Sequence, residues 1–176
     1  MLNIRPFNPG EETAPLAELD TRFTTERIYR VRRCGLSFVL EEEPIDPPYR
    51  KHYPLAGLEA ELATMDQILV AELGRKVVGF TALKFEAWNR QVVVHHLYVA
   101  PPHRGCGAGR RLLDEALEFA RMAGARGLWL ETQNTNYPAI RFYLRTGFRL
   151  CGLDDSLYDP AGQGQGEVGL FFARDL

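Results

Sequence analysis

The strongest strand signal lies in the middle of the chain. Three runs there, 67–73, 76–88 and 91–99, are rich in β-branched and aromatic residues, and two residues separate each run from the next. Two-residue connections between such runs are typical of antiparallel hairpins. The pattern therefore predicts three consecutive antiparallel strands.

Apolar residues at helical spacing occur on both sides of these strands. They predict a long helix over 11–33, a short helix over 58–65 and an amphipathic helix over 109–124. A fourth helix is expected to begin after Asn136, a good N-cap residue, and to end at Gly147. The sequence thus predicts helices both before and after the three strands.

The remaining segments complete a mixed sheet. The segment 43–49 contains three prolines, which exclude a helix interior and favour an extended loop. The order of elements predicts a single domain over residues 1–176, of the α/β or α+β class, in which helices flank a mixed, mostly antiparallel sheet. Further short strands are predicted over 2–6, 128–132, 148–153 and 167–173.

Composition excludes several classes of protein. The 176 residues include 21 lysines and arginines and 23 aspartates and glutamates, so the formal net charge is −2. This balance lacks the basic character of nucleic-acid-binding proteins, and no apolar run approaches the roughly 20 residues that cross a bilayer. The first residues also lack the order of a signal peptide. We expect a cytoplasmic protein with neither nucleic acid nor membrane as its partner.

The cysteines favour the same compartment. Cys34, Cys106 and Cys151 are odd in number, form no C-x-x-C pair and have no histidine at metal-ligand spacing. This usage fits a reducing compartment and predicts neither a disulfide framework nor a metal site.

The segment 99–113 joins the end of a predicted strand to the start of a predicted helix. Glycines allow several backbone amides to point into one concavity, and the N-terminus of a helix adds partial positive charge. The segment therefore predicts a loop that binds phosphate or pyrophosphate, with a plain strand-to-helix connection as the alternative. Its glycines and arginines are Gly105, Gly107, Gly109, Arg104, Arg110 and Arg111.

Two common phosphate-binding motifs do not match this loop. A nucleotide P-loop ends in Gly-Lys-Ser/Thr, whereas Arg110 and Arg111 follow Gly109. A dinucleotide fingerprint counted from Gly105 requires glycine where Arg110 stands. The pattern that remains, R-x-x-G-x-G from Arg104 to Gly109, resembles the acetyl-coenzyme A loop of the GNAT superfamily of N-acetyltransferases. The order of elements over nearly the whole chain is also similar to that family.

The resemblance implies how the cofactor is held. GNAT enzymes use acetyl-coenzyme A as a cosubstrate, without a metal, in a cleft between two parallel strands that splay apart. Here these strands are 91–99 and the strand that begins near Leu128. The implied cofactor-binding residues are Leu97, Tyr98, Val99, Arg104, Gly105, Cys106, Gly107, Ala108, Gly109, Arg110 and Asn136.

Transfer to an amine requires proton chemistry. An alkylammonium is protonated near pH 7, so a base must take its proton, and an acid eases departure of the coenzyme A thiolate. By the resemblance, Tyr143 is the expected acid and His95 the expected base. Successive residues of a strand face opposite sides, so at most one of His95 and His96 faces the acceptor. The competing interpretations are core packing for Tyr143 and hydrogen bonding within the sheet for each histidine.

The block 130–136, with later matches that include Tyr143 and Tyr158, resembles the streptothricin acetyltransferase branch, whose members acylate an amine of a cationic antibiotic. The chain departs from that branch at His95 and His96, where the branch has acidic residues. Charge also favours a cationic acceptor, because residues 151–176 have five acidic side chains against one arginine. Glu41, Glu42 and Glu43 are expected to add to this charge, while residues 22–33 have five arginines against one glutamate.

The sequence therefore predicts an acetyl-coenzyme A-dependent N-acetyltransferase that acts on a primary amine of a small cationic acceptor, with a streptothricin-like antibiotic as the leading example. Two alternatives stay open: acetylation of peptide or protein amines, and a non-catalytic module that binds acyl-coenzyme A. The sequence is compatible with a homodimer under each of these functions.

Overall fold

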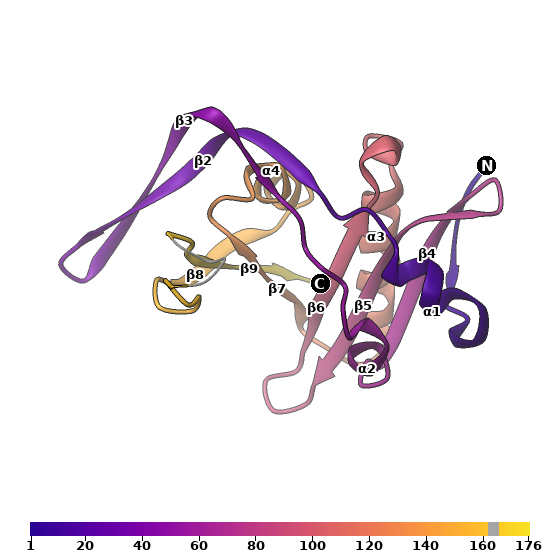
Figure 1. The fold of residues 1–176 in the computed structure, drawn as a ribbon. Coiled ribbons are helices and arrows are strands. Elements are labelled where there is room, and N and C mark those ends of the chain that lie inside the picture. Colours follow the sequence, from indigo (N-terminus) through magenta and orange to yellow (C-terminus); the bar gives the residue numbers. More distant parts are fainter. Residues whose placement is uncertain (162–165) are drawn as a thin grey trace. The chain divides into compact units, whose positions relative to one another are not determined.

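The computed structural model describes residues 1–161 and 166–176 (Figure 1). Their contacts divide into two compact units. The first unit comprises Met1–Arg22, His52–Trp129 and Asp175–Leu176. The second unit comprises Phe23–Lys51 and the described part of Leu130–Arg174. Each unit is built around strands, and each contributes expected site residues.

The first unit contains the predicted antiparallel strands. β1 (Leu2–Pro6), β4 (Gln67–Leu73), β5 (Lys76–Glu86) and β6 (Gln91–Val99) neighbour one another in that order. Gly74 and Arg75, between β4 and β5, both have positive φ, at 57° and 73°. Two such residues form the turn that matches the twist of a hairpin. The central three-strand prediction is therefore confirmed, with the second strand ending at residue 86 rather than 88.

Helices cover both faces of this sheet. Leu16 of α1 (Pro9–Ala17) and Leu58 of α2 (Leu58–Leu62) pack with Val70 and Phe80 in one buried cluster. On the other face, α3 (Ala108–Met122) packs against strand residues that alternate with these. Alternate residues of a strand point to opposite faces, so β4 and β5 are buried on both sides. This double burial explains their continuous apolar runs.

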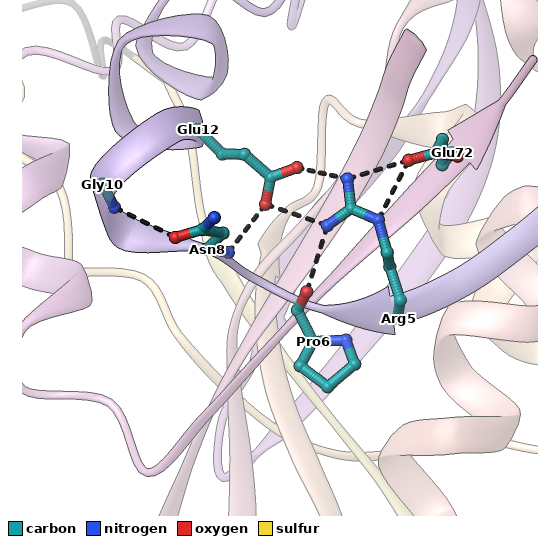
Figure 2. A network of polar contacts seen from close by, with 6 residues as sticks. All are labelled: Arg5, Pro6, Asn8, Gly10, Glu12 and Glu72. Atoms are coloured by element: carbon teal, nitrogen blue, oxygen red, sulfur yellow. Dashed lines mark hydrogen bonds and ion pairs between the residues drawn. The ribbon is translucent and has the colours of Figure 1, made fainter. Parts of the chain in front are cut away.

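An ion-pair network joins α1 to the first two strands of the sheet (Figure 2). The Arg5 guanidinium contacts the carboxylate of Glu12 and donates from Nε to Glu72 Oε2 at 2.9 Å. The Asn8 amide also donates to Glu12 Oε2, at 2.7 Å. Burial opposes ionisation of Glu12, but the hydrogen bonds from Arg5 and the Asn8 amide outweigh it and lower the Glu12 pKa. The network fixes the start of α1 on β1 and β4.

The second unit corrects the prediction for residues 11–51. The helix predicted over 11–33 ends at Ala17, and the chain continues as a long hairpin of β2 (Phe23–Cys34) and β3 (Ser37–Lys51) (Figure 1). The prolines of 43–49 belong to β3, not to a loop. Proline is tolerated in an edge strand, and the register of this pair shifts between Thr25 and Arg27.

Charge pairing across this hairpin explains why the polar segment forms strands. Arg32 Nε lies 2.8 Å from Glu41 Oε2, and Arg30 Nε lies 3.0 Å from Glu43 Oε2. Opposite charges on neighbouring strands stabilise a sheet by up to about 1 kcal/mol per pair. The three glutamates of 41–43 are thus offset by Arg27, Arg30 and Arg32. Because these glutamates are already ion-paired, their charge is not available to attract a cationic acceptor.

The rest of the second unit follows the predicted order. β7 (Gly127–Gln133) begins in the first unit, where it pairs parallel with β6, and continues into the second. α4 (Tyr137–Arg145) follows, and β8 (Arg149–Asp154) pairs antiparallel with β9 (Gly169–Asp175). The predicted class, a mostly antiparallel mixed sheet with one parallel strand pair and flanking helices, is confirmed. The strand predicted over 167–173 begins at residue 169 instead. The glycine-rich segment before it includes residues 162–165, which lie outside the described residues.

No helix in the described ranges is long and apolar enough to span a membrane.

Candidate active site

The loop after β6 has the backbone shape that an anion site requires. A 3-10 turn (Pro101–His103) follows the end of β6, and α3 begins at Ala108, one residue before the predicted start. Gly105 and Gly107 have φ of 79° and 91°, which an L side chain rarely adopts. An ideal Cβ built on either glycine meets no atom within 4 Å, so the space beside the loop is open. The first amides of α3 have no partner within the helix and favour an anion there.

The three arginines of this segment have different roles. Arg104 donates from Nε to the Val99 carbonyl at 2.9 Å and from Nη2 to the Arg22 carbonyl at 2.7 Å. Arg111 donates to the Leu2 carbonyl. These two arginines therefore brace the loop and helix α3 against neighbouring backbone. Arg110 is exposed and has no side-chain partner in the part of the chain described, so its charge is available to a phosphate.

The end of β6 has the backbone that the resemblance assigns to pantetheine. Its parallel pairing with β7 extends from Gln91 and Gly127 to Val93 and Trp129. Leu97 and Val99 pack toward the cluster that includes α3, whereas Tyr98 packs toward Phe80 on the other face. Cys106, in the loop, is an exposed free thiol, as are Cys34 and Cys151. Within the described residues, no group of three or more potential ligands is arranged to hold a metal ion.

The two histidines of β6 lie at a β-bulge. Val94 pairs with Leu83 and His96 pairs with Ala82, so His95 is the extra residue between them. His95 is exposed on the surface, and partial desolvation of its ring together with nearby His96 lowers its pKa, against opposing effects that include Glu86 and Glu61. A lowered pKa leaves the imidazole neutral near pH 7 and able to accept a proton.

His96 has a different environment. Its Nε2 lies 2.8 Å from Glu61 Oε2 of α2, and its ring lies against Phe80 and Tyr98, at centroid distances of 5.7 and 5.9 Å. Burial lowers the pKa of His96, while the Glu61 carboxylate opposes that shift. The sequence gives no signal for Glu61, because a glutamate on a five-residue helix forms no motif that links it to a distant strand.

The remaining expected residues, Asn136 and Tyr143, belong to the second unit. Asn136 caps α4 by accepting from the Ala139 amide at 3.2 Å, as the sequence predicts. Tyr143 is 7% exposed, with ring centroids of Phe148 and Phe172 at 5.6 and 6.0 Å. The packing expected as the alternative for Tyr143 is therefore present, and it fixes the direction of the phenol.

The second unit also contains a polar network to which the sequence assigned no role. Tyr158 Oη donates to Glu131 Oε1 at 2.5 Å and accepts from Gln133 Nε2 at 2.5 Å. Burial raises the Glu131 pKa, and hydrogen bonding from Tyr158 opposes this. Glu167 is buried and pairs with Lys51 at 2.5 Å. Glu131 and Tyr158 lie 27 residues apart, and their adjacency depends on tertiary structure.

Several acidic residues of 151–176 are already engaged within this unit. Asp155 pairs with Arg33 at 2.5 Å, and Asp154 Oδ1 accepts from the Ser156 hydroxyl at 2.7 Å. The negative charge expected to attract a cation is therefore smaller than the sequence count suggests.

The mixed sheet contains the parallel pair of β6 and β7, and β6 leads through a glycine loop into the amphipathic helix α3. This arrangement is that of an acyl-coenzyme A transferase fold. The chain belongs to the acetyltransferase (GNAT) family, whose model matches residues 26–148. It is 39% identical to streptothricin acetyltransferase of Streptomyces lavendulae, over 97% of this chain and 93% of that protein. It is 27% identical to streptothricin acetyltransferase of Escherichia coli, over 92% of this chain and 90% of that protein.

Solved structures agree with this grouping. A nourseothricin acetyltransferase structure has a TM-score of 0.90 at 39% identity, covering 99% of this chain and 98% of that one. A Bacillus anthracis protein assigned to the streptothricin acetyltransferases, solved in complex with acetyl coenzyme A, has a TM-score of 0.85 at 26% identity, and each chain is covered fully.

Proposed function

We propose that this protein is a cytoplasmic enzyme that transfers the acetyl group of acetyl-coenzyme A to a primary amine of a cationic, streptothricin-like antibiotic. The observation that supports this most strongly is the left-handed Gly105–Gly107 loop at the start of α3, in a chain that matches streptothricin acetyltransferases over nearly its whole length.

The residues around the loop fit the cosubstrate. Open space beside Gly105 and Gly107, the first amides of α3 and the exposed Arg110 would hold the pyrophosphate. The backbone of Leu97, Tyr98 and Val99 would hold the pantetheine arm, with Arg104 fixing the strand end. When bound, acetyl-coenzyme A supplies an acetyl group activated as a thioester.

Two side chains are proposed for proton transfer. His95, exposed and with a lowered pKa, would take a proton from the acceptor ammonium and free the nitrogen lone pair for attack. Tyr143, held by aromatic packing on α4, would donate a proton to the departing thiolate. Transfer is then direct, with no covalent enzyme intermediate. The exposed Cys106 is not needed as a nucleophile.

Preference for a cation is supported by the charge around Glu131. In this network Lys51 is already paired with Glu167, and the hydrogen-bond donor to Glu131 is the neutral Tyr158. Against the raising effect of burial, Lys51 also acts on Glu131 to lower its pKa, which favours the ionised carboxylate. A half-buried carboxylate attracts an ammonium group more strongly than an exposed one, because the local dielectric constant is lower. We therefore propose Glu131 as a contact for the cationic acceptor.

The test is turnover with a panel of acceptors. Purified protein, acetyl-coenzyme A and either streptothricin, a polyamine or a lysine peptide would be assayed for free thiol and for the mass of one added acetyl group. We expect the antibiotic to be acetylated with the highest kcat/KM. Preferred acetylation of the peptide would overturn the antibiotic assignment, and binding of coenzyme A without turnover of any amine would indicate a non-catalytic module.

A replacement of His95 by glutamine tests the proposed base. We expect kcat to fall about 100-fold with little change in acetyl-coenzyme A affinity. A variant with full activity would remove His95 from the reaction.

A further inference from the structure

A hydrogen bond joins helix α2 to strand β6 beside the proposed base. His96 Nε2 and Glu61 Oε2 are 2.8 Å apart, and their side chains are 13% and 55% exposed. The carboxylate can only accept, so the neutral imidazole donates from Nε2. The exposed Glu61 is thereby held by a histidine that is itself fixed between Phe80 and Tyr98.

The other nitrogen of His96 is unsatisfied. Nδ1 is buried without a hydrogen-bond partner, and it is the one such side-chain atom within residues 1–161 and 166–176. A buried acceptor that lacks a donor is destabilising, and most buried polar atoms in proteins do have partners. If the side chain at this position served only packing, an apolar residue could take its place without loss of stability. His96 is therefore better explained by what its Nε2 holds than by stability.

Glu61 also acts on His95. His95 is the bulged residue next to His96, and four charged or titratable groups around it affect its pKa besides burial. His96 on β6 and Lys84 on β5 lower it, whereas Glu86 on β5 and Glu61 on α2 raise it. Glu61 is the one of these four that belongs to a helix and is hydrogen-bonded to a largely buried side chain, that of His96, which is 13% exposed. The hydrogen bond to His96 thus restrains the Glu61 carboxylate.

We propose that Glu61 and His96 form a positioning pair for His95, in which His96 holds the Glu61 carboxylate where it stabilises the positive charge that His95 gains from the acceptor amine. This inference rests on the proposed function, because it assigns support to the proposed base. The acceptor ammonium loses one proton to a ring nitrogen of His95, and its freed lone pair forms the C–N bond as the C–S bond breaks. The thiolate takes a proton from Tyr143. The nitrogen loses its second proton as the amide forms, so one proton is released overall after Tyr143 and His95 are restored by solvent.

The test compares three variants with a matched control. Glu61→Gln removes the charge, His96→Phe removes the hydrogen bond, and His96→Gln retains a side-chain N–H that can donate to Glu61. Glu59→Gln is the control, because Glu59 is an exposed carboxylate on the same helix with no side-chain partner among the described residues.

The first readout is the pH profile of kcat/KM for the acceptor. Activity rises with pH as His95 loses its proton. Because Glu61 raises the His95 pKa, its loss moves the midpoint to lower pH and lowers the plateau roughly three- to tenfold. His96→Phe should lower the plateau in the same way, with a smaller shift of the midpoint, because loss of His96 also removes its own lowering effect on the His95 pKa. His96→Gln should restore part of the activity, and Glu59→Gln should match the unmodified protein. The KM for acetyl-coenzyme A should not change in any variant.

Two further measurements separate the possible failures. The His95 pKa, followed by NMR titration of its ring proton without substrates, should fall in Glu61→Gln and not in Glu59→Gln. Thermal unfolding should show His96→Phe at least as stable as the unmodified protein, because the unsatisfied Nδ1 is removed. An unchanged His95 pKa, or a loss of activity in His96→Phe that follows a loss of stability, would overturn the positioning role. Absence of turnover by the unmodified protein would refute the proposed function instead, and the titration would still decide whether Glu61 acts on His95.

Discussion

Replacement of Gly107 tests whether the loop before α3 binds the cofactor through its backbone shape. Gly107 is the residue before the first turn of α3, with φ of 91° and ψ of −4°. Its Cβ position is open, so alanine would meet no clash, and the cost of Gly107→Ala comes from the left-handed backbone alone. That cost is about 1–2 kcal/mol for an L residue.

The chain provides a control with nearly the same geometry. Gly57 precedes α2 with φ of 81° and ψ of 4°, and its Cβ position is also open. Gly57→Ala should therefore lower the free energy of unfolding by a similar amount, without altering an anion site. Gly107→Glu adds a negative charge within about 5 Å of a bound phosphate, which costs a further 1–3 kcal/mol or about five- to 150-fold in Kd.

Calorimetric titration with coenzyme A, together with urea unfolding, separates strain from binding. We expect Gly57→Ala to bind with unchanged Kd, Gly107→Ala to bind several-fold more weakly, and Gly107→Glu to bind about five- to 150-fold more weakly again. If all three variants lose equal stability and Gly107→Glu still binds with the original Kd, the assignment of this loop to the pyrophosphate is wrong.

Three other substitutions test separate parts of the account. Tyr143→Phe keeps the packed ring and removes the hydroxyl, so kcat should fall about 100-fold in steady-state assays while coenzyme A affinity stays the same; full activity would exclude Tyr143 as the acid. Glu131→Gln should raise the acceptor KM several-fold and leave the acetyl-coenzyme A KM unchanged; an unchanged acceptor KM would exclude it as a cation contact. Glu12→Gln should cost about 2 kcal/mol of unfolding free energy at pH 7, because it breaks the partly buried pair with Arg5. Since the Glu12 pKa is lowered in the folded state, its contribution is complete above the ordinary value of 4.5 and is lost as pH falls below it, so urea unfolding should show the two proteins converging at low pH. A difference that persists at low pH would contradict this explanation.

The parts of the fold that the sequence predicted have strong local signals. The two-residue turn at Gly74 and Arg75 and the glycine loop before α3 both require positive φ, and glycine marks such positions directly. Asn136 and Gly147 similarly delimit α4, because capping depends on residues near the helix end.

The error over residues 18–51 arose where the stabilising contacts lie between strands. The predicted helix rests on Leu16, Leu19 and Phe23, which stand at helical intervals. Arg30 and Arg32 are two residues apart, as on one face of a strand, and their partners Glu43 and Glu41 follow only after the turn of the hairpin. Cross-strand pairing overrides local helix preference in such a segment. The Glu61–His96 contact and the Tyr158–Glu131 contact were missed for the same physical reason, since both depend on tertiary structure.

The bulge at His95 also has no signal in the sequence. Strict alternation along β6 places His95 and His96 on opposite faces, but His95 is an extra residue that interrupts the alternation. Its imidazole is exposed, whereas that of His96 is only partly exposed. The proposed base could therefore be named from the family pattern, while the group that supports it required the structure.

The most direct test of the account is the release of free thiol when the purified protein is mixed with acetyl-coenzyme A and streptothricin. We predict stoichiometric formation of coenzyme A and of monoacetylated antibiotic, at a rate far above that without the antibiotic. Binding of coenzyme A with no thiol release above that background, for streptothricin and for the other amines, would contradict the assignment of this protein as an amine acetyltransferase.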